Sequence, residues 1–427
     1  MSTTRRAVLR GLTGAALTSA APLPARAQDG RGSLLARVRT DLEHHAALGY
    51  KFSGGPGDIA TAAWISTRLE AAGYRVEESA ADMPFWHERA ARLEAGSASV
   101  DVQPQAPVVP TGPRGVTARL ALVEDGSPDV RGRIAVLLTP FGRHAALSPD
   151  TGIGQTVVGL AEAGARAVVI VTRGPSGEAI ALNVRPAAPF VPVPAAILAP
   201  KDAGAIIEAA RSEAEGTLIL DGDSTHRPSP NLVARIERGD RWIAISTPRS
   251  GWYQCVGERG TGTAAFLEIA AWAVRRFPQH SIWLLSSGGH EYYFAGSEHV
   301  TDMPPPEDTR VWVHIGASLA VRNAEERDGE LVMLDTADPR RTLMATDTAR
   351  DAVTDAFGGL PGYSTPAAVR GGELPLFLER GYTTAFATIA THSWFHTVQD
   401  TLERVDERHL VPVIRAYQRG IELLADA

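Results

Sequence analysis

The spacing of apolar residues predicts two helices and a strand near the start of the chain. Apolar positions recur at helical intervals in Leu34–Leu48 and again in Asp58–Ala72. Asp58 is a candidate N-cap of the second helix, and Gly73 is suited to end it. Residues 74–77 then alternate between apolar and polar, as a half-buried strand does.

Residues 100–225 have a different pattern. They open with the run PQAPVVPTGPRG, which is rich in Pro and Gly. Five short apolar segments with strand character follow: ARLALVE, GRIAVLLT, ARAVVIVT, PAAILA and GTLILDG. Helical patterns around Val157–Ala163 and Lys201–Ala214 separate them. This alternation predicts a small α/β domain inserted at residues 100–225, with THRPSPN (225–231) as the linker that leaves it.

Strands and helices alternate again after this insert. The predicted strands are NLVARIE, RWIAIST, HSIWLLSS and VWVHIG. The last two are predicted to be buried, and HSIWLLSS contains the continuous apolar run IWLL. The predicted helices are Thr263–Arg275, Arg341–Ala356, Pro375–Arg380 and His409–Ala425. We therefore predict an α/β fold in which residues 28–99 and 226–427 form a mixed, mostly parallel sheet sandwiched by helices.

The loops that follow the strands should carry the chemistry, because ligands of open α/β sheets bind beyond the carboxyl ends of the strands. These loops are Pro248–Gly262, Gly288–Ser297, the residues after VWVHIG, and Thr391–Thr401. Five of the chain's twelve histidines lie in these loops or at the strand ends: His290, His299, His314, His392 and His396. This concentration predicts a shared site.

The net charge of the protein limits the classes of partner that it can bind. The chain has 427 residues, of which 44% are hydrophobic, and a formal net charge of −7. An acidic balance argues against nucleic acids and anionic membranes, both of which bind basic surfaces. No stretch reaches the roughly 18 consecutive apolar residues that a membrane span needs. We therefore expect a small-molecule or peptide ligand, with no nucleic acid and no membrane span.

The first residues have the order of an export signal. A twin-arginine pattern, TTRRAVL at residues 3–9, precedes a mildly apolar stretch from Gly11 to Leu23. Small residues follow in Ala25-Arg26-Ala27, where a signal peptidase would cut. We expect residues 1–27 to be a signal peptide for twin-arginine export, which makes the mature protein periplasmic or secreted.

Three further segments resemble motifs of a known family. They are SGGPGDIATAAWISTRLEAAGYRVE, GHEYYFAGSEHV and WFHTVQDTLERVD. The sequence resembles the aminopeptidase-type zinc exopeptidases, which include secreted bacterial aminopeptidases, glutamate carboxypeptidases and glutaminyl cyclases. The last two segments resemble the family's Glu-Glu-x-Gly-Leu-x-Gly-Ser and Tyr-His-x-x-x-Asp-Thr motifs. The insert resembles the protease-associated domain that many members carry.

The resemblance also implies where this chain departs from the family's two-zinc site. The first His ligand and its Asp fall on Thr247–Arg249, so both are replaced. The bridging Asp corresponds to Glu258 and the catalytic Glu to His290. The Asp ligand of the next strand falls at about Gly316. Only the adjacent Glu ligand, Glu291, and the final His ligand, His396, are kept, so a standard two-zinc site is not expected.

One interpretation of these changes is a rebuilt site with a single zinc ion. Glu291 and His396 would be joined by His290 or His314 around the metal, with one position open for water. Zinc lowers the pKa of bound water toward about 7, and Glu258 would act as the general base.

A second interpretation is chemistry without a metal. His290 would act as acid or base with Glu258 as its partner, and Arg249 and Arg259 would bind an anionic group. Three aromatic side chains would stack on an aromatic or sugar-like substrate: Trp252, Tyr253 and Tyr292. Glu373 would contact the ligand or cap the helix that follows it.

A third interpretation is a ligand-binding protein that has lost catalysis. Structural roles also remain open: Arg249 and Glu258 would form an ion pair, and Trp252 and Tyr253 would belong to the core. The Arg, Glu, His, Trp and Tyr residues at the site favour a changed enzyme over a decayed one. We therefore predict a peptidase-like hydrolase with a non-standard site, acting on a peptide, an amide or another small polar substrate.

Overall fold

The computed structural model describes residues 33–124, 129–300, 305, 309–327, 330–363 and 365–426. The predicted signal peptide, residues 1–27, lies outside these ranges. Within them, no helix is long and apolar enough to cross a membrane.

The main sheet is mixed and mostly parallel, which confirms the predicted fold class. Its strands run in the order β14-β15-β11-β9-β10-β8. Four neighbours are parallel: β9 (Trp242–Pro248), β10 (Ser281–Ser287), β11 (Thr309–His314) and β15 (Ala385–Ala390). Two outer strands are antiparallel to their neighbours: β14 (Arg341–Ala345) and β8 (Glu215–Ile236).

Both faces of this sheet are buried, because alternate side chains of each strand point to opposite faces. Ile243 and Ile245 of β9 belong to the larger core, whereas Ala244 packs with Trp283 and Trp312 on the other face. Burial of this kind stabilises the fold by about 25 cal/mol per Å² of apolar surface. The near-continuous apolar runs of these strands reflect burial from both sides.

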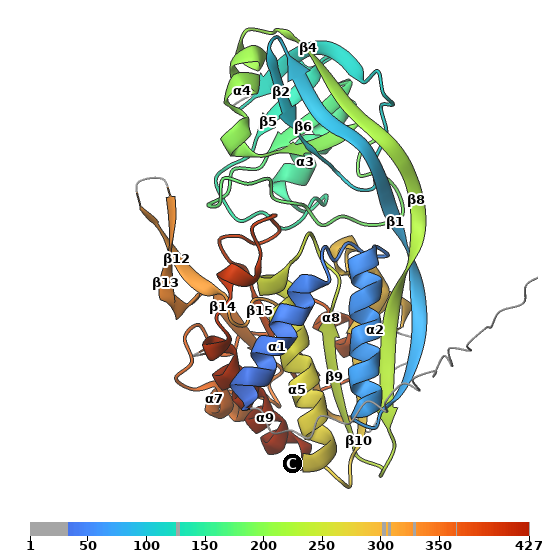
Figure 1. Cartoon of the computed structure of the whole chain (residues 1–427), viewed down its shortest axis with the longest axis vertical. Coiled ribbons are helices and arrows are strands. Elements are labelled where there is room, and N and C mark those ends of the chain that lie inside the picture. The colour runs from blue at the N-terminus through green and yellow to red at the C-terminus, as the bar shows by residue number, and fades with distance from the viewer. Residues whose placement is uncertain are drawn as a thin grey trace, which may run out of the picture. The chain divides into compact units, whose positions relative to one another are not determined.

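Helices on the larger core close one face of the sheet (Figure 1). They are α1 (Leu34–Ala47), α2 (Pro56–Ala71), α5 (Thr261–Arg276), α7 (Arg350–Phe357) and α9 (Glu407–Ala425). On the other face lies α8 (Leu374–Leu378), whose Phe377 stacks on Trp312 with ring centroids 4.1 Å apart. The short helix α6 (Ala295–His299) follows β10.

Two local predictions in the main domain are wrong. The predicted helix over residues 341–356 is β14 followed by α7, because Arg341 to Ala345 pair with β15 and tertiary pairing overrides the local spacing. Asp58 does not cap α2, whose N-cap is Gly55. Its carboxylate instead accepts hydrogen bonds from Gly54 N and Ser229 Oγ.

The insert is attached by two long strands. β1 (Arg75–Ala95) and β8 pair antiparallel from Arg75–Arg235 to Ala95–Gly216, and Figure 1 shows them side by side. THRPSPN is therefore part of β8, and the prediction that it is a linker is wrong. The domain limits at residues 100 and 225 stay a prediction.

The sheet continues from β8 into the insert, which has its own apolar cores. Its strands are β2 (Ala98–Asp101), β3 (Gln103–Pro104), β4 (Val116–Val123), β5 (Ile134–Leu138), β6 (Ala167–Val171) and β7 (Ala195–Leu198). Its helices are α3 (Gly152–Glu162) and α4 (Gly204–Arg211). A separate hairpin, β12 (Arg322–Arg327) with β13 (Glu330–Ala337), follows β11 and was not predicted.

Candidate active site

The loops at the carboxyl ends of β9, β10, β11 and β15 hold most of the strained backbone. Seven described non-glycine residues have positive φ, and six of them lie in these loops: Tyr253, Cys255, Tyr293, Phe294, Ser318 and His396. Such conformations cost about 1–3 kcal/mol each and cluster at functional sites. The loops also contain two single-turn helical segments, η2 (Val256–Gly260) and η3 (His290–Tyr292).

A buried histidine–carboxylate pair links the β10 loop to α8. His290 Nδ1 lies 2.8 Å from Glu373 Oε1. Glu373 immediately precedes α8 and is fully buried. Its Oε2 accepts hydrogen bonds from Ser297 Oγ at 2.7 Å and Ser287 Oγ at 3.0 Å. The carboxylate of Glu373 therefore has a fixed position and a fixed hydrogen-bonding partner on the imidazole.

The ionisation of this pair determines which ring nitrogen is reactive. Burial would raise the pKa of Glu373, but the hydrogen bond and charge of His290 outweigh it and lower that pKa to about 2. Burial, followed by the charge of Arg259, lowers the pKa of His290 against the opposing effect of Glu373. At neutral pH Glu373 is therefore ionised and His290 neutral, so Nδ1 carries the proton and Nε2 the lone pair.

His290 Nε2 is the free end of the pair. No hydrogen bond reaches it from the residues that the structure describes. The side chain keeps 13% of its surface exposed, whereas Glu373 has none. A base held by a buried acid and open on its other side is the arrangement that general acid–base catalysis needs.

A second charged cluster centres on Glu258 in η2. Glu258 Oε1 accepts a hydrogen bond from Arg259 Nη2 at 2.5 Å and lies 3.4 Å from His396 Nε2. Asp400 positions this turn by accepting the backbone N–H groups of Gly257 and Glu258 at 2.8 and 3.0 Å. Gly257 is required there, because a Cβ would lie 2.4 Å from Asp400 Oδ1.

This cluster contains one acceptor without a donor. Burial raises the pKa of Glu258, but the charges of Arg259 and His396 dominate and leave that pKa well below its usual range. Glu258 Oε2 is buried and has no hydrogen-bond partner among the described residues. Arg259 Nη1 likewise makes no hydrogen bond there, since the guanidinium uses Nε for Ser250 O and Nη2 for Glu258. An ionised acceptor and a free donor thus lie side by side, which suits a polar group of a ligand.

The carboxylate of Glu291 accepts hydrogen bonds from two serine residues. Its Oε1 accepts hydrogen bonds from Ser53 N at 2.8 Å and Ser53 Oγ at 2.7 Å, and its Oε2 accepts one from Ser250 Oγ at 2.7 Å. The serine hydroxyls also accept the N–H groups of Gly289 and His290. Burial, the largest effect, raises the pKa of Glu291 although these hydrogen bonds oppose it.

The three predicted metal ligands each contact other protein groups. Both oxygens of Glu291 already accept hydrogen bonds, and His314 Nδ1 is bonded to Ser246 Oγ at 2.9 Å. Burial lowers the pKa of His314 to about 4. His396 faces Glu258, which Arg259 already neutralises. Among the described residues, no group of three or more His, Cys, Asp or Glu side chains is placed to hold a metal.

The position implied for the family's Asp ligand has no room for a side chain. A Cβ at Gly316 would lie 1.6 Å from Thr388 O, so any larger residue would force the two strands apart.

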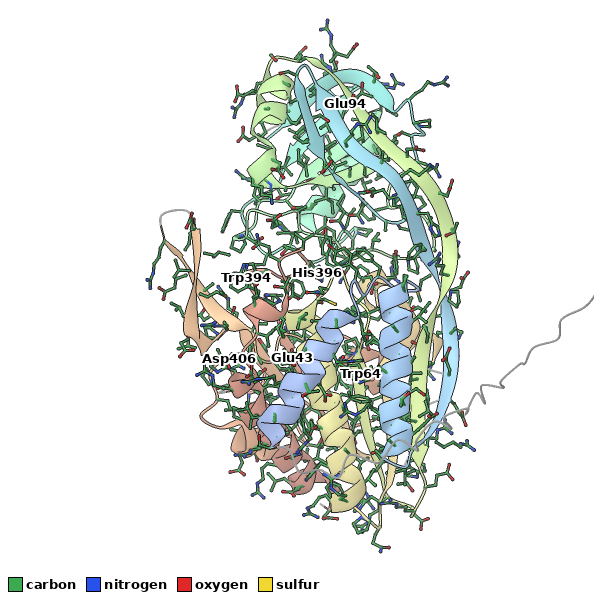
Figure 2. All side chains as sticks on the ribbon, viewed as in Figure 1. Glu43, Trp64, Glu94, Trp394, His396 and Asp406 are labelled. Atoms are coloured by element: carbon green, nitrogen blue, oxygen red, sulfur yellow. The ribbon has the colours of Figure 1, made fainter. Side chains whose placement is uncertain are left out.

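The insert contacts the His396 loop directly. Ala181 N donates to His396 O at 2.9 Å, and His396 Nδ1 is 2.8 Å from Ala181 O. Nearby, Val184 N donates to Glu291 O at 3.0 Å. Figure 2 labels His396 and Trp394 in this loop, on the side of the main domain that faces the insert. The insert thus forms part of the wall of the site.

Arg249 lies apart from the chemistry predicted for it. It is fully buried, and its Nε donates to Asp58 Oδ1 at 2.9 Å. Its remaining donors bind the carbonyl oxygens of Ser286 and Pro230. The alternative of an Arg249–Glu258 ion pair is wrong, because Arg249 pairs with Asp58 and Glu258 with Arg259. With no donor left over, Arg249 supports the loop, and we give it no part in ligand binding.

The predicted aromatic residues line a cavity of about 590 Å³ between the insert and the main domain. Trp252, Tyr253 and Tyr292 all belong to its wall, together with Ser53 and Glu291. The described lining residues do not include His290, Glu258, Arg259 or His396. The cavity is therefore separate from the His290–Glu373 pair. Glu291, which lines the cavity, is the residue that follows His290 in the chain.

Several residues of the site were not predicted from the sequence, and one predicted residue lies outside it. Ser53, Ser250 and Asp400 were not singled out, and Asp58 was expected only as a helix cap, since short hydroxyl and acidic residues in loops usually serve turns and caps. Glu373 was expected to contact a ligand or cap a helix, and its pairing with His290 was not foreseen. His299 lies on the surface, where its Nε2 meets Ser79 Oγ at 3.0 Å.

Solved aminopeptidases are similar to this chain over nearly its full length. A zinc aminopeptidase from Bacillus subtilis is 17% identical with a TM-score of 0.69, covering 91% of this chain and 94% of its own. An aminopeptidase from Aneurinibacillus sp. strain AM-1 is 15% identical with a TM-score of 0.65, covering 92% and 94%. No protein-family model matches the sequence, and no curated protein matches it. The chain therefore has the fold of the zinc aminopeptidases with a divergent sequence, as its motifs predicted.

Proposed function

We propose that this protein is a peptidase-like hydrolase that works without a metal, with His290 as its general base. The observation that carries this proposal is the 2.8 Å contact of His290 Nδ1 with the buried Glu373, which leaves Nε2 unbonded. The substrate is a peptide, an amide or another small polar compound, as the aminopeptidase fold favours. The Bacillus subtilis neighbour is a zinc aminopeptidase. In this chain a zinc ion is not required, because Arg259 already supplies a buried positive charge beside Glu258.

The reaction follows from the ionisation of the pair. His290 Nε2 takes a proton from a water molecule while the water oxygen bonds to the substrate carbonyl carbon. Glu373 stabilises the resulting imidazolium through Nδ1. The imidazolium then returns its proton to the leaving nitrogen as the carbon–nitrogen bond breaks, which restores neutral His290.

Arg259 and Glu258 bind the polar part of the substrate. Arg259 Nη1 is a free donor that would stabilise negative charge developing on the carbonyl oxygen, and Glu258 Oε2 would accept a hydrogen bond from the substrate. Removing one such donor costs about 10²–10³-fold in kcat. Glu291, which the sequence placed among the catalytic residues, supports the loop because both its oxygens are occupied.

The alternative is a ligand-binding protein without catalysis. Its support is the cavity, whose described lining residues include none of the His290 or Glu258 groups. One set of variants separates the two functions. Wild type, His290→Ala and Glu373→Gln are assayed against chromogenic aminoacyl and acyl amides, with chelator present. Hydrolysis that disappears in His290→Ala supports the enzyme, whereas hydrolysis that is equal in all three would overturn it.

Export by the twin-arginine route is part of this proposal. It rests on the order of arginine pair, apolar stretch and Ala25-Arg26-Ala27. Replacing Arg5 and Arg6 with lysine should retain the chain in the cytoplasm. Equal export of the variant would contradict this route.

A further inference from the structure

The cavity that the insert shares with the main domain has several aromatic rings in its wall. Phe52, Trp86, Trp252, Tyr253 and Tyr292 contribute to its wall, and its volume is about 590 Å³. Pockets of roughly 300–1,000 Å³ with mainly apolar walls are typical sites for small molecules. Proline residues, among them Pro84 and Pro189, complete much of the remaining surface.

The charges at this wall are negative. Glu88 and Glu291 line the cavity, and no lysine or arginine is among its described lining residues. Arg227 covers the ring of Phe85 at 4.3 Å but is not part of the lining. His226 is the one titratable base on the wall among the described residues.

Glu291 is buried without a cation. Its hydrogen-bond donors, Ser53 and Ser250, are neutral, and no ion pair to it exists within the described residues. A buried carboxylate without a positive partner is costly, so a cation placed against this wall would gain from it. Glu88 remains exposed and marks the open side of the cavity.

The polar groups of the wall are already paired with one another. Tyr253 OH donates to Gln103 Oε1, Tyr292 OH donates to Pro84 O, and Trp252 Nε1 donates to Asn183 Oδ1 at 2.7 Å. The carboxylates of Glu88 and Glu291 attract a cation by charge. A quaternary ammonium group needs no hydrogen-bond acceptor, because the faces of aromatic rings attract it as well.

We propose that this cavity binds a compound with a quaternary ammonium group on an apolar or aromatic body. The inference stands apart from the catalytic proposal, because binding needs neither His290 nor Glu373. Benzyltrimethylammonium is a suitable probe, and neopentylbenzene is its neutral analogue of the same shape. Titration calorimetry should show binding of the cation at least about tenfold tighter than the analogue, since each 1.4 kcal/mol is a factor of ten.

Substitutions in the wall of the cavity test whether benzyltrimethylammonium binds there. Trp252→Leu and Glu88→Gln should each weaken binding of benzyltrimethylammonium, and Glu88→Gln sits at an exposed position where folding is not at risk. Trp64→Leu is the matched control, because Trp64 lies on α2 and is not among the lining residues. His290→Ala should bind the probe as wild type does. Equal affinity for the neutral analogue, no binding of the cation, or unchanged binding in both Trp252→Leu and Glu88→Gln would overturn the proposal.

Discussion

Glu291 and Glu373 are both buried carboxylates beside the β10 loop, yet their surroundings have opposite effects. Glu373 faces the imidazole of His290, and its pKa falls to about 2. Glu291 faces the neutral hydroxyls of Ser53 and Ser250, and its pKa rises. Burial acts in the same direction on both, so the partner decides the charge state. The carboxylate that the resemblance implies as a metal ligand is bonded to serine hydroxyls, whereas the one that the motifs do not mark is paired with the proposed base.

The strongest test of this comparison is His290→Ala. Removing the general base should lower kcat by about 10²–10⁴-fold. The melting temperature should fall as well, because the buried Glu373 carboxylate loses the imidazole that pairs with it, so kcat is measured at a temperature where the variant is folded. His299→Ala is the control, since His299 lies on the surface beside Ser79. A His290→Ala enzyme as active as the control would remove His290 from the reaction.

The next largest effect concerns the second charged cluster. Glu258→Gln leaves the buried Arg259 without its carboxylate and should destabilise the fold by about 3–5 kcal/mol. The double variant Glu258→Gln/Arg259→Met removes both charges and should recover part of that loss. Urea denaturation of wild type, the two single variants and the double variant measures the free energy of unfolding of each. A double variant that loses the sum of the single losses would show that the two side chains are not coupled.

As the pH falls, the ionisation of Glu373 and that of Glu291 should change the free energy of unfolding in opposite directions. The folded pKa of Glu373 lies below its ordinary 4.5, so its stabilisation is present above pH 4.5 and is lost as the pH falls toward 2. This amounts to about 3 kcal/mol at 1.36 kcal/mol per pKa unit. Glu373→Gln should therefore flatten the loss of stability in that range. An unchanged pH profile in Glu373→Gln would contradict the pairing with His290.

Glu291→Gln should change the pH dependence of stability in the direction opposite to Glu373→Gln, and by a smaller amount. The folded pKa of Glu291 is raised, so protonation favours the folded state as the pH falls from that pKa toward 4.5. The amide keeps one acceptor for the serine hydroxyls, and stability at neutral pH should change by about 1 kcal/mol. Urea midpoints at several pH values measure this. A loss as large as that of Glu258→Gln would show that Glu291 has a charged partner.

Zinc should have the smallest effect of all. With Arg259 beside Glu258 and hydroxyls around Glu291, zinc has no prepared site, so neither zinc nor chelator should shift the melting temperature. Magnesium serves as the control ion in the same thermal scans. A stabilisation that grows with zinc concentration would overturn this reading of the site.

The sequence predicted the fold more fully than the site. Buried strands such as β10 contain continuous apolar runs, and the two motifs lie at strand ends, so sheet and loops were both recognisable. The pairing of His290 with Glu373 was not, because the two residues are 83 positions apart and meet only through the fold. The length of β1 was also missed, since β8 supplies its partner from beyond the insert.

The antiparallel pairing of β1 with β8 constrains the order in which the chain can fold. The loop that this pairing closes spans the whole insert, from residue 96 to residue 215. Contacts so distant in sequence form late, because the entropy of closing the loop is lost before the pairing energy is gained. During synthesis, the end of β1 can pair with β2 early, but the rest of β1 waits for β8, which ends at Ile236. We therefore expect the insert to fold first and then to bring the two long strands together, so that a mutation in its apolar cores would slow assembly of the main sheet, to which β8 joins it.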